Sequence, residues 1–257
     1  MIREHFEYRT TITTILADER SHIVAAKEAM IAARQEVEAY IATDPFFGMT
    51  LEPYLPQAES LTVGRMVKAG SAAGVGPMAA VAGSIAWAGV EAMQEGGALF
   101  GVIDNGGDIA IISDRDIRIG LYAGGAPAGA SRAFVLPKQS GIYGVCTSSA
   151  TVGPSISFGT ADAVTVFARD VSLADAWATS LCNRSGAGSE ELFTPLEDSG
   201  IDGACVITGD NIALWGEVPP FVPARVDESL ISAGHGGAVT AHILRKTQPP
   251  GRTPPSP

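Results

Sequence analysis

A stretch rich in glycine and alanine lies in the first third of this 257-residue sequence: Gly74-Val75-Gly76-Pro77-Met78-Ala79-Ala80-Val81-Ala82-Gly83. Proline suits the first turn of a helix, where its missing N–H would have no partner in any case. The uncharged run from Gly76 to Val90 is shorter than the ~20 residues that a membrane-spanning helix needs. The stretch therefore predicts a long, buried, Ala/Gly-rich helix inside a globular core.

The segments before this stretch predict two strands and a helix. Residues 6–16 are rich in β-branched side chains and predict a strand. Residues 21–41 place apolar side chains at helical spacing and predict an amphipathic helix. Residues 44–57 contain three prolines and predict a connection. Residues 61–68 predict a second strand directly before the glycine-rich turn.

The segments after it predict mainly strands, separated by Gly, Asn and Asp turns. The predicted strands are residues 98–103, 108–113, 117–122, 142–147, 164–169, 203–208 and 211–215. A second, shorter helix is predicted from Leu173 to Cys182. Because strands outnumber helices and do not alternate with them regularly, we expect an α+β fold with mainly antiparallel sheets.

Composition predicts one compact unit over residues 1–247, because 46% of the residues are hydrophobic and 18% are charged. Residues 248–257 contain five prolines and predict a disordered tail. The net charge of −11 argues against nucleic acid and anionic membranes as partners. A phosphorylated small molecule is compatible with this negative charge, because backbone N–H groups and a bound cation can hold phosphate without a basic surface.

The location predicted from the sequence is the cytoplasm. The first seven residues contain charges and no apolar run, unlike a secretory signal. The three cysteines, Cys146, Cys182 and Cys205, form no C-x-x-C pair, which indicates buried thiols in a reducing compartment.

Two glycine-rich segments are candidate ligand sites. Gly74, Gly76 and Ala79 fit the dinucleotide-binding spacing of an oxidoreductase, although a tight turn into a closely packed helix explains them equally. Asn105-Gly106-Gly107-Asp108 has the composition of a hairpin turn. It is also a loop in which paired glycines allow backbone to approach a ligand and Asp108 offers an acceptor. Taken alone, each segment favours a turn.

The shorter helix carries a candidate metal site. Asp175 and Thr179 are four residues apart and share one helical face, and Mg²⁺ accepts a carboxylate and a hydroxyl among few protein ligands. A capping box with Ser172 at the N-cap and Asp175 at the third helical position explains the same acid. His235 lies among glycines, and Cys146 precedes Thr147, but loop histidines and buried strand cysteines are commonly without a role. The sequence contains no G-x-S-x-G, H-E-x-x-H or P-loop motif.

The order of three motifs resembles the ApbE-like superfamily of FAD:protein FMN transferases. The motifs are Asn105-Gly106-Gly107-Asp108-Ile109, Thr147-Ser148-Ser149 and Ala174-Asp175-Ala176-Trp177-Ala178-Thr179. Over residues 6–244 the chain looks closer still to the uncharacterised UPF branch of that superfamily, in which residues 76–83 are the most recognisable feature.

The resemblance implies an α+β fold that holds a flavin nucleotide, FAD or FMN, and Mg²⁺ between its halves. It implies Asp175 and Thr179 as Mg²⁺ ligands, with a backbone carbonyl near residues 76–79 as a third. Asn105, Gly106, Gly107 and Asp108 are implied near the nucleotide together with Gly76, Thr147 and Ser148. The implied chemistry is attack by a threonine of a target protein on the FAD pyrophosphate.

The chain departs from the transferases at two places. Residues 76–83 lack the lysine and the following aspartate of their helix start, and residues 150–163 lack their histidine-containing H-I-x-D-P segment. Two hypotheses follow. The first is a nucleotide-binding protein with a diverged phosphoester or flavin-transfer reaction. The second is a non-catalytic ligand-binding or scaffold protein with the same fold.

Overall fold

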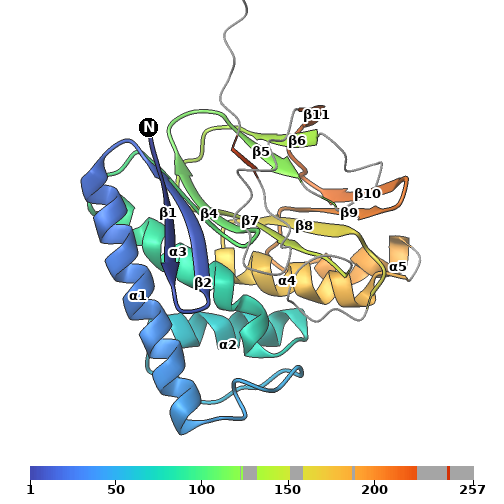
Figure 1. The fold of residues 1–257 in the computed structure, drawn as a ribbon. Coiled ribbons are helices and arrows are strands. Elements are labelled where there is room, and N and C mark those ends of the chain that lie inside the picture. The colour runs from blue at the N-terminus through green and yellow to red at the C-terminus, as the bar shows by residue number, and fades with distance from the viewer. Residues whose placement is uncertain (122, 124–131, 151–158, 187–188, 225–241, 244–257) are drawn as a thin grey trace, which may run out of the picture.

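The chain folds into three layers: helices cover one face of a large sheet, and a smaller sheet covers the other face (Figure 1). The computed structural model describes residues 1–121, 123, 132–150, 159–186, 189–224 and 242–243. His235 and the predicted tail, residues 248–257, lie outside the described residues.

The large sheet is antiparallel throughout, in the strand order β1-β2-β3-β4-β7-β8-β9-β10. Its strands are β1 (Ile2–Tyr8), β2 (Thr11–Ala17), β3 (Phe100–Asn105), β4 (Asp108–Ser113), β7 (Tyr143–Ser148), β8 (Ala163–Ala168), β9 (Gly203–Thr208) and β10 (Asn211–Gly216). The predicted α+β class with antiparallel sheets is therefore confirmed. The prediction of one strand over residues 6–16 is wrong, because the chain turns at Arg9, whose φ is 57°, and two strands pair.

The small sheet has the order β11-β6-β5-β12 and faces the large sheet. Its strands are β5 (Ile117–Leu121), β6 (Arg132–Leu136), β11 (Phe221–Pro223) and β12 (His242–Ile243). Phe134 connects the layers, because its ring lies 4.9 Å from that of Phe167 in the large sheet and stacks at 4.7 Å on Phe221. An aromatic core of this kind holds the two sheets together.

The helical layer consists of α1 (Arg20–Thr43), α2 (Leu61–Ala73), a 3₁₀ turn (Pro77–Ala80), α3 (Val81–Glu95), α4 (Val171–Arg184), α5 (Ser189–Phe193) and a second 3₁₀ turn (Thr194–Leu196). α1 buries Ile23, Ala26, Met30, Ala33 and Val37 along one face. α3 lies centrally, against α1, α4 and the strands β3 and β4.

The segment predicted as a strand over residues 61–68 is the helix α2, so that prediction is wrong. Val63, Met66, Val67 and Gly70 are buried at helical spacing, and the Ser60 side chain accepts a hydrogen bond from the Val63 N–H at 3.1 Å. Gly74 ends the helix in the left-handed conformation with φ 72°. The dinucleotide-binding interpretation fails with it, because a helix, not a strand, precedes the glycines and the sheet is antiparallel.

Ser60→Ala tests the reassigned helix. Because the change removes the hydroxyl that accepts from Val63, we expect a loss of about 1 kcal/mol in the free energy of unfolding, measured by urea denaturation. The matched change Ser71→Ala, inside the same helix, should be neutral or slightly stabilising. Equal effects of the two changes would argue against the cap.

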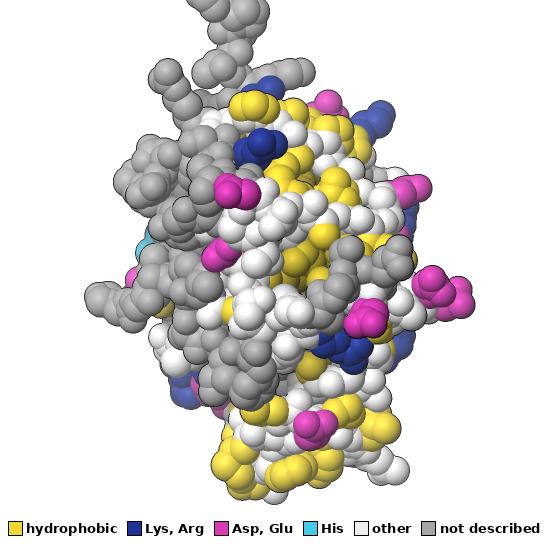
Figure 2. Space-filling view, turned by 90° about the vertical axis from the view of Figure 1, so that its right-hand side faces the viewer, with side chains coloured by type: hydrophobic (Ala, Val, Ile, Leu, Met, Phe, Trp, Pro, Cys, Tyr) yellow, Lys and Arg dark blue, Asp and Glu magenta, His cyan; other side chains and the backbone are white. Residues whose placement is uncertain are grey.

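The connection between α1 and α2 packs on one side and exposes apolar side chains on the other. Phe47 is fully buried, whereas Phe46, Met49 and Leu55 are more than half exposed. Figure 2 shows apolar side chains gathered at the lower end of the molecule, where this connection lies. Among the described residues no single helix is long and apolar enough to cross a membrane, and α2 with residues 77–95 passes such a test only as a pair bent by 108°.

Candidate functional site

The start of α3 is capped by a carboxylate from another helix. The residue at its N-cap, Ala80, offers no side-chain acceptor. Instead, Asp175 of α4 accepts a hydrogen bond from the Gly83 N–H at 2.7 Å and a second from the Ala82 N–H. A carboxylate is favourable here because the free N–H groups and dipole of a helix start attract negative charge.

The predicted capping box within α4 is therefore wrong. α4 begins after Asp170, whose side chain accepts from the Leu173 N–H at 2.9 Å. Ser172 is inside the helix and hydrogen-bonds Ser84 of α3, with 2.8 Å between the two hydroxyl oxygens. Asp175 lies one turn further on and is buried. Sequence reasoning missed Ser84 and its contact with Ser172, since no local pattern marks a contact between two distant helices.

Gly83 allows the two helices to approach this closely. A Cβ added at Gly83 would lie 2.9 Å from the Cβ of Asp175 and 3.0 Å from the Val171 carbonyl oxygen. Such distances are too short for ordinary contacts, so a larger residue would separate α3 from α4. The glycine therefore keeps the carboxylate against the helix start.

The β3–β4 hairpin brings two more polar side chains to the same place. Gly106 and Gly107 form its two-residue loop, with φ values of 71° and 107°, which glycine adopts readily. Asn105 and Asp108 are paired across the hairpin, so both project toward the helical layer. The Asn105 side chain donates to the Ala82 carbonyl at 2.9 Å. The hairpin turn and the candidate site are thus the same feature.

Asp108 and Asp175 form a buried carboxyl pair. They are hydrogen-bonded to each other, so one carboxyl group carries the proton between them. Burial raises the pKa of Asp175 to about 7. Burial and, next, the charges of Asp175 and Asp104 raise the pKa of Asp108 well above its usual range.

Cys146 borders this pair on β7, directly opposite Asp108. Burial and the two neighbouring carboxylates raise the pKa of its thiol well above the usual range. Because the thiolate is the nucleophilic form, this environment keeps Cys146 unreactive. Cys146 belongs to the packing of the site.

The carboxyl pair makes the stability of the protein depend on pH in the opposite direction from an ordinary ion pair. The folded pKa of Asp175 is about 7, above the unfolded value of ~4, so the folded state binds more protons between these values. The free energy of unfolding should therefore fall as the pH rises from 5 to 8, by about 1–4 kcal/mol. Urea titrations in EDTA at both pH values measure this difference. Asp175→Asn should reduce it strongly; an unchanged difference would contradict the assignment.

The Thr147–Ser148 motif lies at the same end of the sheet, but its two side chains face opposite layers. The Thr147 hydroxyl lies 2.9 Å from that of Thr165, on the side of the small sheet. Ser148 shares its face with Cys146, toward the helices. The Thr147 N–H donates to the Gly107 carbonyl at 3.0 Å and so connects β7 to the hairpin loop.

The other predicted residues lie around the helix start. Thr179 follows Asp175 by one turn of α4 and is half-buried. The Gly76 N–H donates to the Leu51 carbonyl at 2.8 Å, and a Cβ added at Gly76 would lie 2.0 Å from the Thr50 carbonyl oxygen. Packing against the α1–α2 connection therefore explains this glycine. Among the described residues, no cluster of three or more His, Cys, Asp or Glu side chains is arranged to hold a metal ion.

Comparisons of the whole sequence identify the family. Residues 3–206 match the family model described as AbpE bacteria. A UPF0280 protein of Methanosphaerula palustris is 62% identical, over 91% of this chain and 99% of that protein. One from Methanoregula boonei is 57% identical, again over 91% and 99%. The chain belongs to the UPF0280 family.

Solved structures show that the UPF0280 chain has the ApbE-like fold. The Flavin Transferase ApbE from Vibrio cholerae matches with a TM-score of 0.55 and 13% identity, over 83% of this chain and 96% of that one. The apo form of the Pseudomonas stutzeri flavinyl transferase ApbE matches with a TM-score of 0.54 and 14% identity, over 91% and 98%. The resemblance inferred from the three motifs is therefore confirmed for family and fold.

Proposed function

We propose that this UPF0280 protein binds a phosphorylated nucleotide, a flavin nucleotide such as FAD or FMN in the first instance, together with Mg²⁺ at the start of α3. The observation that carries the proposal is the convergence of Asp175, Asp108 and Asn105 on that helix start from three separate elements. The names of the two structural relatives, both flavin transferases, support the choice of ligand.

The residues present fit a magnesium ion. Asp175 and Thr179 offer a carboxylate and a hydroxyl one helical turn apart, and Mg²⁺ takes few protein oxygens and keeps waters or phosphates for its other positions. A cation is also needed electrostatically, because the Asp175 carboxylate already occupies the α3 start and would repel a phosphate. The carbonyl groups of residues 76–79 are the proposed third protein ligand.

The remaining residues of the site would position the nucleotide. Gly106 and Gly107 leave their backbone free of side chains beside the carboxyl pair. Ser148 faces the same layer as that pair, and Thr147 would act through its N–H, which holds the Gly107 carbonyl. Gly76 holds the turn that leads into α3. When bound, Mg²⁺ would neutralise the charge that develops on a phosphoryl group under attack.

The reaction in this proposal is a diverged phosphoester or flavin-transfer reaction. A hydroxyl or water oxygen gives up its proton to solvent and bonds to the FMN-side phosphorus of the FAD pyrophosphate, the P–O–P bond breaks, and AMP leaves with the bridging oxygen. The lysine, aspartate and histidine of the transferases are absent from residues 76–83 and 150–163. In this proposal the chain keeps the residues that bind the nucleotide and lacks part of the transferase apparatus.

A second candidate function, binding without catalysis, is favoured by the structural use of Asp175. Its carboxylate caps α3 and shares a proton with Asp108, which alone accounts for a buried acid at this position. A non-catalytic ligand-binding or scaffold protein would keep these contacts for stability.

Calorimetric titration of the full chain with FAD, FMN and ADP, with and without Mg²⁺, tests the proposal. We expect binding that strengthens with Mg²⁺, and release of AMP from FAD on longer incubation. Binding without AMP release would favour the second candidate. No heat of binding and no thermal shift with any of the three nucleotides would overturn the proposed function.

A further inference from the structure

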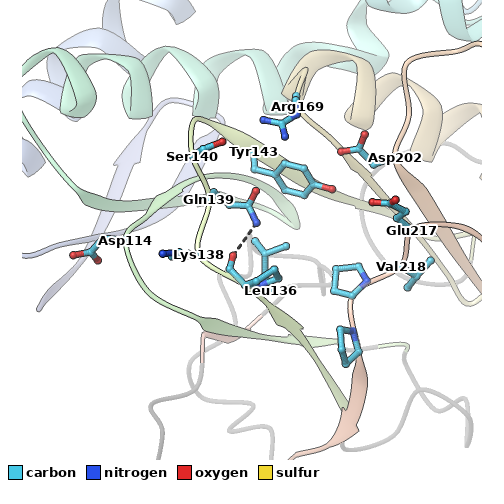
Figure 3. Close-up of a pocket in the computed structure, with 13 residues that line it drawn as sticks. Asp114, Leu136, Lys138, Gln139, Ser140, Tyr143, Arg169, Asp202, Glu217 and Val218 are labelled. Carbon is cyan, nitrogen blue, oxygen red and sulfur yellow. Dashed lines mark hydrogen bonds between the residues drawn. The ribbon is translucent and has the colours of Figure 1, made fainter.

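A cavity of about 720 Å³ opens on the face of the large sheet that lies away from the helical layer and Asp175. Its walls are the two connections by which the chain passes between the sheets, residues 137–142 after β6 and 217–220 after β10. Tyr143, the first residue of β7, lies in its centre (Figure 3). Tyr143 belongs to the core between the two sheets, whereas Asp175 belongs to the helical layer. The large sheet therefore lies between the cavity and the proposed nucleotide site.

The charged side chains of the cavity are sorted along the Tyr143 ring. In Figure 3, Arg169 and Lys138 lie on the side of its backbone attachment, and Asp202 and Glu217 lie at its hydroxyl end. Asp114 also lies on the Lys138 side, but its carboxylate is paired with Arg115 at 2.6 Å. Within the described part of the chain, neither cation forms an ion pair. The cavity therefore presents positive charge at one end and negative charge at the other.

The negative end borders the tyrosine hydroxyl. Burial and, next, the charge of Asp202 raise the pKa of the Tyr143 phenol far above its usual range, so the phenol stays neutral beside that carboxylate. Tyr143 is 7% exposed and belongs to the core between the two sheets.

We propose that this cavity binds a small zwitterion of the ω-amino acid type, with its ammonium group at Asp202 and Glu217 and its carboxylate at Arg169 and Lys138. The aliphatic body of such a ligand would lie along the Tyr143 ring, Leu136 and the Pro219–Pro220 segment.

The shape and charge of the cavity select this class. Its volume lies within the ~300–1,000 Å³ of small-molecule sites. An α-amino acid holds its two charges too close together to reach both ends. Asp202 and Glu217 form no ion pair within the described residues. A purely anionic ligand would therefore be repelled by these two carboxylates. The inference is independent of the proposed nucleotide site.

Titration of the ¹⁵N-labelled full chain with glycine, 4-aminobutyrate and 6-aminohexanoate tests the proposal by NMR. The amide signals of residues 138–143 and 217–218 should shift, with affinity rising along the series. Hexanoate and hexylamine, which carry one charge each, should bind at least ~5-fold more weakly than 6-aminohexanoate.

Three variants locate the charges. Arg169→Gln and Glu217→Gln should each weaken binding of 6-aminohexanoate by about 5-fold, because each removes one charged contact. Arg20→Gln, at an exposed arginine of α1, should leave it unchanged. The proposal is overturned by no shift of these signals at about 20 mM of any zwitterion, or by hexanoate binding as well as 6-aminohexanoate.

Discussion

Asp175→Asn should remove the dependence of nucleotide binding on Mg²⁺ while the protein stays folded. Asparagine keeps the size of the side chain and an oxygen that accepts from the Gly83 N–H. It removes the negative charge that a cation requires. We expect FAD affinity in Mg²⁺ to fall by ~100-fold, equivalent to about 2.7 kcal/mol, measured by calorimetry.

The chain supplies a matched control for this change. Asp170→Asn makes the same chemical substitution at the start of the same helix, where the side chain caps Leu173. It should cost some stability and leave the effect of Mg²⁺ on binding intact. If Asp175→Asn binds FAD with an undiminished Mg²⁺ effect, Asp175 is not a ligand of the cation and its role is confined to capping α3.

Gly76→Ala should be the most destabilising small substitution near the site. The added Cβ would lie 2.0 Å from the oxygen and 2.9 Å from the carbon of the Thr50 carbonyl, and backbone atoms cannot rotate away as a side chain can. Separating the turn from the connection would also weaken the hydrogen bond from the Gly76 N–H to Leu51. We expect a loss of about 3 kcal/mol in the free energy of unfolding, measured by urea denaturation.

Gly64→Ala is the control for the loss of a glycine as such. Gly64 lies in α2, and an added Cβ would meet no atom within 4 Å. Alanine there should be neutral or stabilise the protein by up to about 1 kcal/mol. Similar stabilities for Gly76→Ala and the native protein would show that the turn relaxes without cost, contrary to the packing described for it.

The fold class was predictable because most strands are short β-rich runs bounded by glycine and asparagine turns. The helix α2 was not predictable in the same way. Val63, Met66 and Val67 suit a strand by composition and a helix by spacing, and the cap at Ser60 decides in favour of the helix. The hairpin at Arg9 was missed because the run of β-branched residues continues across the turn.

The sequence indicated which residues belong to the candidate site, but not which of them contact one another. The order of the three motifs identified Asp108 and Asp175, which are 67 positions apart in the sequence and hydrogen-bonded in the fold. Local spacing left Asp175 as either a Mg²⁺ ligand beside Thr179 or a cap of its own helix. The structure shows a cap of α3, which depends on the close crossing at Gly83 and on no local pattern. Contacts of this kind arise from packing, so a single sequence does not encode them in readable form.

The most direct test of the central claim is to locate the bound cation. Mn²⁺ in place of Mg²⁺, added to the ¹⁵N-labelled protein with FAD, broadens the NMR signals of nearby amides. The account predicts that the strongest broadening is at Gly83, Gly107 and Asp175. Broadening centred on Tyr143, or none in the presence of FAD, would contradict a cation-dependent nucleotide site at the start of α3.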